Sequence, residues 1–349
     1  MKLLLKTAFI AVVAGFLFSQ IGMFLPWLLG PMLAVLLLRQ FTELEFYWPK
    51  LFRTAGLLLL GVQIGSSFTR DAVLLMWVDL PYMAFMTVSV IIVALLLGLL
   101  FRKMANETTA TSMLGSMPGG LSQMVLISEE VESANVTVVL MMQTFRIFLV
   151  VTTVPFLTTF IAQGEFSDLE ENAFSFSPGA FILALTIGAV LYAGMKRISF
   201  PAAELMAPVL IMAIVQTVTS SELIEMPPFL IIIAQILIGT HLGLQMGRLR
   251  ENMSFRLAAA IAVNNALLIA FSVFIAYLLA KWLPAYPFLD FFLSAAPGGM
   301  AEMGITALAA GADVALITSF HLFRLFFILL LAAPVAAYAV KKLDAKMKN

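Results

Sequence analysis

Residues 117–124 read MPGGLSQM, and residues 296–303 read APGGMAEM. The second octet begins 179 residues after the first, and two further pairs of segments recur at nearly the same offset. These pairs are GVQIG at 61–65 with GTHLG at 239–243, and FR at 145–146 with FR at 323–324. Landmarks that repeat in the same order indicate that the chain is a duplication of one ancestral half.

The composition is that of a membrane protein. Of the 349 residues, 62% are hydrophobic and 11% are charged, and the mean hydropathy is +1.04, whereas about a quarter of a soluble domain is charged. A bilayer core about 30 Å thick needs about 20 apolar residues per helix. The first hydrophobic segment lacks a cleavage site of small residues, so we expect a spanning helix there and not a signal peptide. The hydrophobic segments lie at 4–22, 25–39, 52–69, 80–101, 107–131 and 135–160, and at 178–195, 201–219, 228–247, 256–280, 287–311 and 314–340.

Each Pro-Gly-Gly octet interrupts a hydrophobic segment. Limbs of about 10–12 residues, at about 1.5 Å per helical residue, reach only half way into the bilayer core. Proline removes a backbone donor and paired glycines permit unwound backbone, which is tolerated at that depth where it lines a cavity. We therefore expect two tips near the midplane that form a substrate or ion site, and a helix kink without a ligand is the alternative. The tip residues are Pro118, Gly119, Gly120, Pro297, Gly298 and Gly299.

The positive charges favour one topology, because Lys and Arg concentrate on the cytoplasmic side of short membrane loops. If every segment spanned, Lys196, Arg197 and Arg256 would lie outside when the N-terminus is inside. If each Pro-Gly-Gly segment enters and leaves by one side, only Arg70 and Lys281 among the loop cations lie outside. About five spans then remain per half. Because this number is odd, the second half enters the membrane in the orientation opposite to that of the first half. The predicted fold is an all-α polytopic membrane protein with two inverted-topology repeats, each with one re-entrant or broken segment.

This topology also sets the predicted domains. The first repeat covers residues 1–162 and the second covers residues 179–349. The link at 163–178 carries acidic residues and no Lys or Arg, and it lies on the extracytoplasmic side. Both termini are then cytoplasmic.

Polar side chains follow the tips. Gln123 stands three residues after the second glycine of the first octet, beside Ser122, and Glu302 has the same place in the second octet. A charged side chain at the centre of a bilayer costs about 2.5–3.5 kcal/mol on insertion scales. We therefore expect Glu302 to face an aqueous or ion-filled site, as a proton carrier or sodium ligand. Structural pairing with an arginine is the alternative.

Two arginines lie deep in hydrophobic segments. Arg146 and Arg324 are too far from an interface to snorkel, and their planar forks suit carboxylates. They could hold an anionic substrate or anchor Glu302, and both alternatives stay open. His321 precedes Arg324 by three residues, and its approximate repeat mate is Gln143. Gln in place of His indicates hydrogen bonding more than metal ligation.

Other polar and small residues favour helix packing. The glycines of 61–65 and 239–243 permit close approach of helices, and Asn264 and Asn265 are suited to hydrogen bonds between helices.

The sequence also excludes several classes of site. It contains no cysteine and two histidines, so a Cys/His or three-His metal centre cannot be assembled. We predict no metal, no cofactor and no catalytic residue, and hence no enzyme. The formal net charge of +0 gives no general attraction to nucleic acid.

The paired octets, together with PWLLGPM at residues 26–32, resemble the bacterial membrane AbrB family over essentially the whole chain. That family is distinct from the small DNA-binding regulator of the same name, and its members carry labels such as ammonia monooxygenase or regulator of aidB expression. The monooxygenase label fits poorly, because oxygen chemistry at copper or iron needs clustered ligands. At the level of fold, five-span inverted repeats with paired broken elements also resemble carriers such as the bile-acid and citrate transporters.

We therefore expect a secondary, ion-coupled transporter of a small, anionic solute that works by alternating access. A membrane regulatory or scaffold protein that affects gene expression indirectly is the alternative, and a membrane enzyme comes third. The expected location is the bacterial inner membrane. The expected partners are the lipid bilayer, the solute, sodium or protons, and a second copy of the chain in a homodimer.

Overall fold

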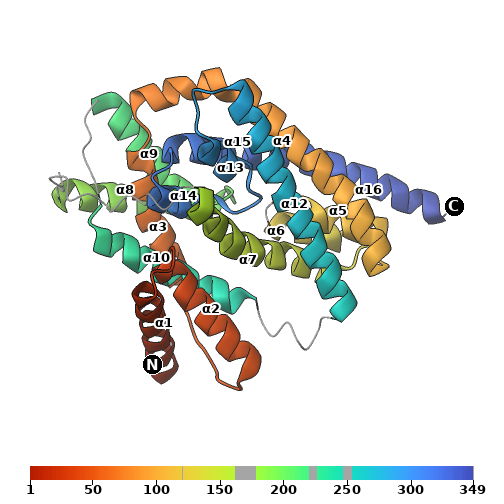
Figure 1. Ribbon diagram of the computed structural model, residues 1–349, viewed down its shortest axis with the longest axis horizontal. Coiled ribbons are helices and arrows are strands. Elements are labelled where there is room, and N and C mark those ends of the chain that lie inside the picture. Colours follow the sequence, from red (N-terminus) through yellow and green to blue (C-terminus); the bar gives the residue numbers. More distant parts are fainter. Residues whose placement is uncertain (120, 162–177, 220–225, 247–253, 349) are drawn as a thin grey trace. The chain divides into compact units, whose positions relative to one another are not determined.

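The computed structural model describes residues 1–119, 121–161, 178–219, 226–246 and 254–348, and every regular element in these ranges is a helix (Figure 1). A π-helical turn, η1, joins α15 to α16. The helices are α1 Lys2–Gln20, α2 Pro26–Phe41, α3 Lys50–Ser66, α4 Arg70–Ala105, α5 Thr109–Ser116, α6 Leu121–Glu129, α7 Val136–Ile161, α8 Pro178–Arg197, α9 Ala203–Thr219, α10 Pro228–Gln245, α12 Phe255–Trp282, α13 Phe288–Ala295, α14 Met300–Ala310, α15 Val314–Phe327, η1 Ile328–Ala332 and α16 Ala333–Lys348.

Seven described helices are long and apolar enough to cross a bilayer. They confirm the prediction of an all-α polytopic membrane protein at this level, and the count of ten spans stays a prediction. Shorter apolar helices lie at Pro26–Phe41, Ala203–Thr217 and Met300–Ala310. The seven long helices are Lys2–Gln20, Arg70–Ala105, Val136–Ile161, Pro178–Arg197, Pro228–Gln245, Phe255–Trp282 and Val314–Val340.

The helices follow the same order in the two halves. A shift of 178 residues carries the bounds of α3 from 50–66 to 228–244, and α10 spans Pro228–Gln245. The short helices correspond as well, α5 with α13 and α6 with α14.

The chain divides into two compact units. Unit 1 comprises Met1–Val78, Pro155–Arg248 and Ala301–Thr318, and unit 2 comprises Asp79–Val154, Leu249–Met300 and Ser319–Asn349. Each unit takes helices from both halves, so the units do not coincide with the two predicted repeats. The predicted linker at 163–178 lies outside the described residues except for Pro178, where α8 begins.

In unit 1, α3 packs against α9 through glycines. A Cβ atom at Gly61 would lie 2.7 Å from the carbonyl oxygen of Leu205, and one at Gly65 would lie 2.9 Å from that of Val209. Successive turns of α3 therefore meet successive turns of α9 in the same order. The two helices run parallel.

The same contact recurs between α10 and α2. An added Cβ at Gly243 would lie 2.5 Å from the carbonyl oxygen of Met32, and one turn earlier Gly239 faces Leu28. These two helices also run parallel. The prediction that these glycines serve close packing is confirmed, because any side chain there would meet backbone atoms.

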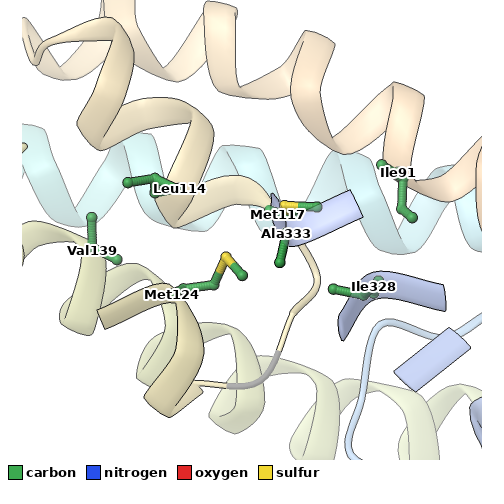
Figure 2. Packing of buried hydrophobic residues seen from close by; sticks show 7 residues of the cluster. All are labelled: Ile91, Leu114, Met117, Met124, Val139, Ile328 and Ala333. Carbon is green, nitrogen blue, oxygen red and sulfur yellow. The ribbon is translucent and has the colours of Figure 1, made fainter. Parts of the chain in front are cut away.

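In unit 2, a hydrophobic cluster surrounds the first Pro-Gly-Gly segment (Figure 2). Met117 lies at the break between α5 and α6, and Met124 reaches toward it from α6. The second half contributes Ile328 from η1 and Ala333 from α16, so residues of both halves pack around this break. The buried members are Ile91, Leu114, Met117, Met124, Val139, Ile328 and Ala333.

We predict that Gly243→Ala destabilises the protein by about 1–3 kcal/mol, the usual cost of overpacking. The matched control is Gly194→Ala, because nothing lies within 4 Å of an added Cβ at Gly194. Thermal unfolding in detergent, followed by circular dichroism, should show a lower midpoint for Gly243→Ala alone. Equal midpoints for the two variants would contradict the packing.

Candidate functional site

The first octet separates two short helices. Helix α5 ends at Ser116 and α6 begins at Leu121. Met117 has φ −63° and ψ 127°, the extended conformation that a residue before proline favours. Pro118 has no N–H group to continue the helix. Within the first tip, residues 117–119, the carbonyl oxygen of Met117 accepts from the N–H group of Gly119 at 2.8 Å. The other hydrogen bonds to the tip carbonyls come from elsewhere in the protein.

The second octet behaves in the same way. Helix α13 ends at Ala295 and α14 begins at Met300. Ala296, which precedes Pro297, has φ −53° and ψ 133°. The four short helices contain 8, 9, 8 and 11 residues, so that only α14 is as long as the predicted limbs. Residues 296–299 form the second tip.

Arg146, on α7, binds the main chain of the first tip. Its Nη1 donates to the carbonyl oxygen of Met117 at 2.9 Å, and its Nη2 donates to that of Gly119 at 3.3 Å. Nη2 also donates to Oε1 of Gln143 at 2.6 Å. Gln143 and Arg146 form what we term the first clamp.

Gln143 adds further bonds to the same segment. Its Nε2 lies within hydrogen-bond distance of the carbonyl oxygens of Leu114 at 3.0 Å, Gly115 at 3.2 Å and Met117 at 3.0 Å. The amide oxygen thus fixes the guanidinium group, while the amide nitrogen holds the end of α5.

The second clamp, His321 and Arg324 on α15, has the same arrangement. Arg324 donates from Nη1 to the carbonyl oxygen of Ala296 and from Nη2 to that of Gly298, each at 2.8 Å. Nη2 lies 2.6 Å from Nδ1 of His321, and Nε2 of His321 lies 3.0 Å from the carbonyl oxygen of Leu293. The residues that correspond in the two clamps are Leu114 with Leu293, Met117 with Ala296, Gly119 with Gly298, Gln143 with His321 and Arg146 with Arg324.

Both guanidinium groups are buried, with Arg146 5% exposed and Arg324 7% exposed. Among the residues that the structure describes, their hydrogen-bond acceptors are carbonyl oxygens, Gln143 and His321, and none is a carboxylate. The positive charge of Arg146 acts on that of Arg324. Unit 2 therefore holds two buried positive charges that main-chain dipoles solvate.

Glu302 lies on α14, at the start of the third segment of unit 1. A Cβ atom at Gly304 of this helix would lie 3.2 Å from Cγ1 of Ile64, so α14 packs on α3. The charge of Arg53, on α3, acts on Glu302. Arg53 itself forms an ion pair with Glu204 of α9 at 3.2 Å.

The pairing of Glu302 with Arg146 or Arg324 stays a prediction, because Glu302 lies in unit 1 and the two arginines lie in unit 2. In the described part of the chain, the hydrogen bonds of Arg146 and Arg324 go to the tips and to their clamp mates. Arg53 is the cation whose field reaches Glu302.

Two polar atoms at the first tip are buried without a hydrogen-bond partner among the described residues. They are Oε1 of Gln123, on α6, and Nε of Arg146. Gly120 and the side chain of Ser122, both predicted site residues, lie outside what the structure describes. Gly299 completes the second tip next to Gly298.

From the sequence, Gln143 was identified only as the approximate repeat mate of His321. The tip carbonyl oxygens were not predicted as acceptors for the arginines. The available signal was the spacing of three residues between Gln143 and Arg146 and between His321 and Arg324. That spacing places both polar groups of each clamp on one helix face. Asn264 packs as predicted, since its Oδ1 lies 3.4 Å from Oγ of Ser116 on α5.

We predict that Arg146→Lys destabilises the protein by about 1.5–3 kcal/mol, the cost of a lost hydrogen bond to a charged group. The ammonium keeps the charge but lacks the planar fork that reaches two carbonyl oxygens and Gln143 together. The control is Arg70→Lys, because Arg70 is exposed at the start of α4. Thermal unfolding in detergent should separate the two variants, and an unchanged midpoint for Arg146→Lys would show that the clamp is dispensable.

Comparison with known proteins agrees with the resemblance of the paired motifs. A protein of Escherichia coli (strain K12), named as a candidate regulator, AbrB, is 25% identical, and the match covers 89% of this chain and 89% of that protein. The uncharacterized protein YhjN of Bacillus subtilis (strain 168) is 25% identical, with 93% of this chain and 91% of that protein covered. The family model described as "Transition state regulatory protein AbrB" matches residues 27–340, which include both tips and both clamps. The chain therefore belongs to the AbrB family.

Proposed function

We propose that this protein is a secondary transporter of a small anionic solute that works by alternating access in a bacterial inner membrane. One observation carries the proposal: two buried arginines hold the main chain of two broken helices, and no carboxylate is among their described partners. Broken backbone at membrane depth is tolerated where it lines a protein-enclosed or wet cavity. Transporters commonly build their solute and ion sites from paired elements of this kind.

The charge of the clamps supports an anionic solute. Two like charges in a medium of low dielectric constant repel strongly, and carbonyl dipoles offset only part of the cost of burying them. An anion bound beside the tips would lower that cost. Because the arginine forks are largely occupied by the tips, the anion would meet their field and the main chain of the broken helices.

The helix packing of unit 1 supports inverted repeats. Helix α9 is the repeat mate of α2, and it runs parallel to α3. Since consecutive spanning helices cross a bilayer in opposite directions, α2 and α3 are antiparallel. Helix α9 then runs opposite to its mate α2. Helix α10, the repeat mate of α3, runs parallel to α2. It therefore runs opposite to α3.

The predicted topology can be tested with single cysteines, because the chain contains none of its own. Asp168→Cys should react with an impermeant maleimide added outside intact cells, and Lys346→Cys should react only after the cells are opened. This result follows if the link between the halves is extracytoplasmic and the C-terminus is cytoplasmic. The opposite pattern at either position would overturn the inverted model.

Glu302 is the proposed coupling group, with a proton or sodium as the coupling ion. Its carboxylate follows the second tip directly, and Arg53 is a cation against which its charge could be balanced. A second copy of the chain, in a homodimer, would provide a rigid frame against which the tips move. The chain is proposed as a carrier and not as an enzyme.

The alternative is a regulatory or scaffold protein. The name of the Escherichia coli relative describes a regulator, and the chain has no soluble basic module for contact with DNA. A regulatory effect would then follow from altered solute levels, which is compatible with transport. A scaffold, in contrast, predicts no solute flux and a partner that co-purifies.

We predict that small carboxylates stabilise the purified protein. Succinate and citrate should raise the thermal midpoint, and neutral succinamide should not. Saturation at about 100 times the dissociation constant adds about 2.7 kcal/mol of stability. A protein that responds equally to the acid and the amide would not have an anion site.

The carboxylate that binds best should then be transported by proteoliposomes along an ion gradient. Glu302→Gln should abolish flux driven by the coupling gradient and leave solute exchange intact, because only the ion site is lost. Glu45→Gln is the control, since Glu45 is exposed. If Glu302→Gln keeps full gradient-driven flux, the coupling role is wrong.

A further inference from the structure

The two clamps differ at one position that can accept a proton. Gln143 in the first clamp corresponds to His321 in the second, and the two side chains make equivalent bonds. Each accepts a bond from its arginine at 2.6 Å, and each binds the end of the short helix before the tip. Histidine is the one of the two whose side chain can take up a proton.

The bonds of His321 fit a single protonation state. The carbonyl oxygen of Leu293 can only accept, so Nε2 must carry a proton. The guanidinium group of Arg324 can only donate, so Nδ1 must be an unprotonated acceptor. The neutral ring with its proton on Nε2 satisfies both contacts. The imidazolium ion and the other neutral tautomer each leave an N–H facing Arg324.

We propose that His321 is a proton-controlled positioning residue, which holds Arg324 on the second tip when neutral and releases it when protonated. The inference rests on the proposed function, because the second tip is a transport element only if the protein is a carrier. Protonation adds one proton to Nδ1 and no other group changes. The imidazolium ion then presents an N–H donor and a like charge to the guanidinium group of Arg324. The neutral ring presented an acceptor nitrogen at the same place.

The charge that acts on His321 opposes its protonation. Arg324, on the same helix, disfavours the imidazolium ion, and the charge of Arg146 acts on Arg324 in turn. Asp290 lies on α13 one turn before Leu293, and it is buried. His321 itself is 2% exposed, so a proton reaches it only when the tip opens or water enters.

Release of Arg324 would affect the tip directly. The same guanidinium group that binds His321 also binds the carbonyl oxygens of Ala296 and Gly298. When it moves away from a charged His321, these oxygens lose their donors and the second tip can rearrange. The amide of Gln143 does not take up a proton at the pH values at which histidine does, so Arg146 stays bound to the first tip. The duplication would thus provide one fixed tip and one that responds to protons.

The protonation state can be measured directly, because the chain contains only two histidines. The full-length protein, labelled with 15N-histidine in lipid nanodiscs, gives signals for His241 and His321, and His241→Gln assigns them. At neutral pH we expect His321 as the neutral ring with the proton on Nε2. An imidazolium ion, or the tautomer with the proton on Nδ1, would overturn the inference.

The effect on the tip can be measured with a cysteine reporter. Met300 is the first residue of α14 and directly follows the second tip. In the Met300→Cys variant, the rate of maleimide labelling is followed as the pH is lowered. The same reporter combined with His321→Gln corrects for the pH dependence of the thiol itself. On acidification, the labelling rate should rise about tenfold more when His321 is present than in the His321→Gln variant. The loss of one hydrogen bond to a charged group changes an equilibrium by about this factor.

The first clamp provides a reciprocal test that does not depend on the folding of His321→Gln. Gln143→His should confer acid-sensitive labelling on a reporter at Leu121→Cys, the mate of Met300, whereas Gln143 itself should not. Equal pH dependence with and without histidine in either clamp would refute the switch. These readouts need no solute. If the labelling shows the switch but the protein neither binds nor transports carboxylates, only the proposed function is refuted.

Discussion

The interrupted helices leave main-chain carbonyl groups without a donor from the next helical turn, in surroundings that are buried and largely apolar. Each such group costs several kcal/mol if it is left unsatisfied in the hydrocarbon region. Arg146 and Arg324 meet this requirement, because a planar fork can donate to two oxygens of one tip and still reach a third acceptor. The octets and the arginines thus depend on one another. A tip without its arginine loses donors to two carbonyl oxygens, and an arginine without its tip loses most of the dipoles that solvate its charge.

The duplication that we infer from the repeated motifs would account for the pairing of the clamps, and the two halves differ at polar positions beside the tips. The clamps keep arginine in both copies, but Gln143 becomes His321 and Gln123 becomes Glu302. At these two positions the second half thereby has titratable groups where the first half has amides. It also gains one residue, since Pro155 follows Arg146 by nine positions and Pro334 follows Arg324 by ten. The π-helical turn at Ile328–Ala332 lies in that interval, which is how a helix absorbs one extra residue.

The sequence was sufficient to predict the helical membrane class and the two places where helices stop. Runs of about 20 apolar residues have few other structural solutions, and Pro118 and Pro297 end their helices through local sterics. The acceptors of the arginines could not be predicted. Every residue has a carbonyl oxygen, so no pattern of side chains marks the ones that an arginine will bind. Nor does the duplication reveal that α3 pairs with α9 and α10 with α2, because periodicity shows that a face is packed and not which helix covers it.

The clamps also refine the choice between substrate contact and structural pairing for the arginines. Arg324 gives its Nη1 and Nη2 atoms to the second tip and to His321, so it has little capacity left for a bidentate bond to a carboxylate. Arg146 is likewise engaged, except that its Nε has no described partner. The arginines would therefore attract an anion mainly through their field, while the unwound main chain supplies the direct bonds. In such a site, loosening one arginine changes both the shape of the tip and the position of the charge, so a proton taken up at His321 could alter solute affinity without touching the solute.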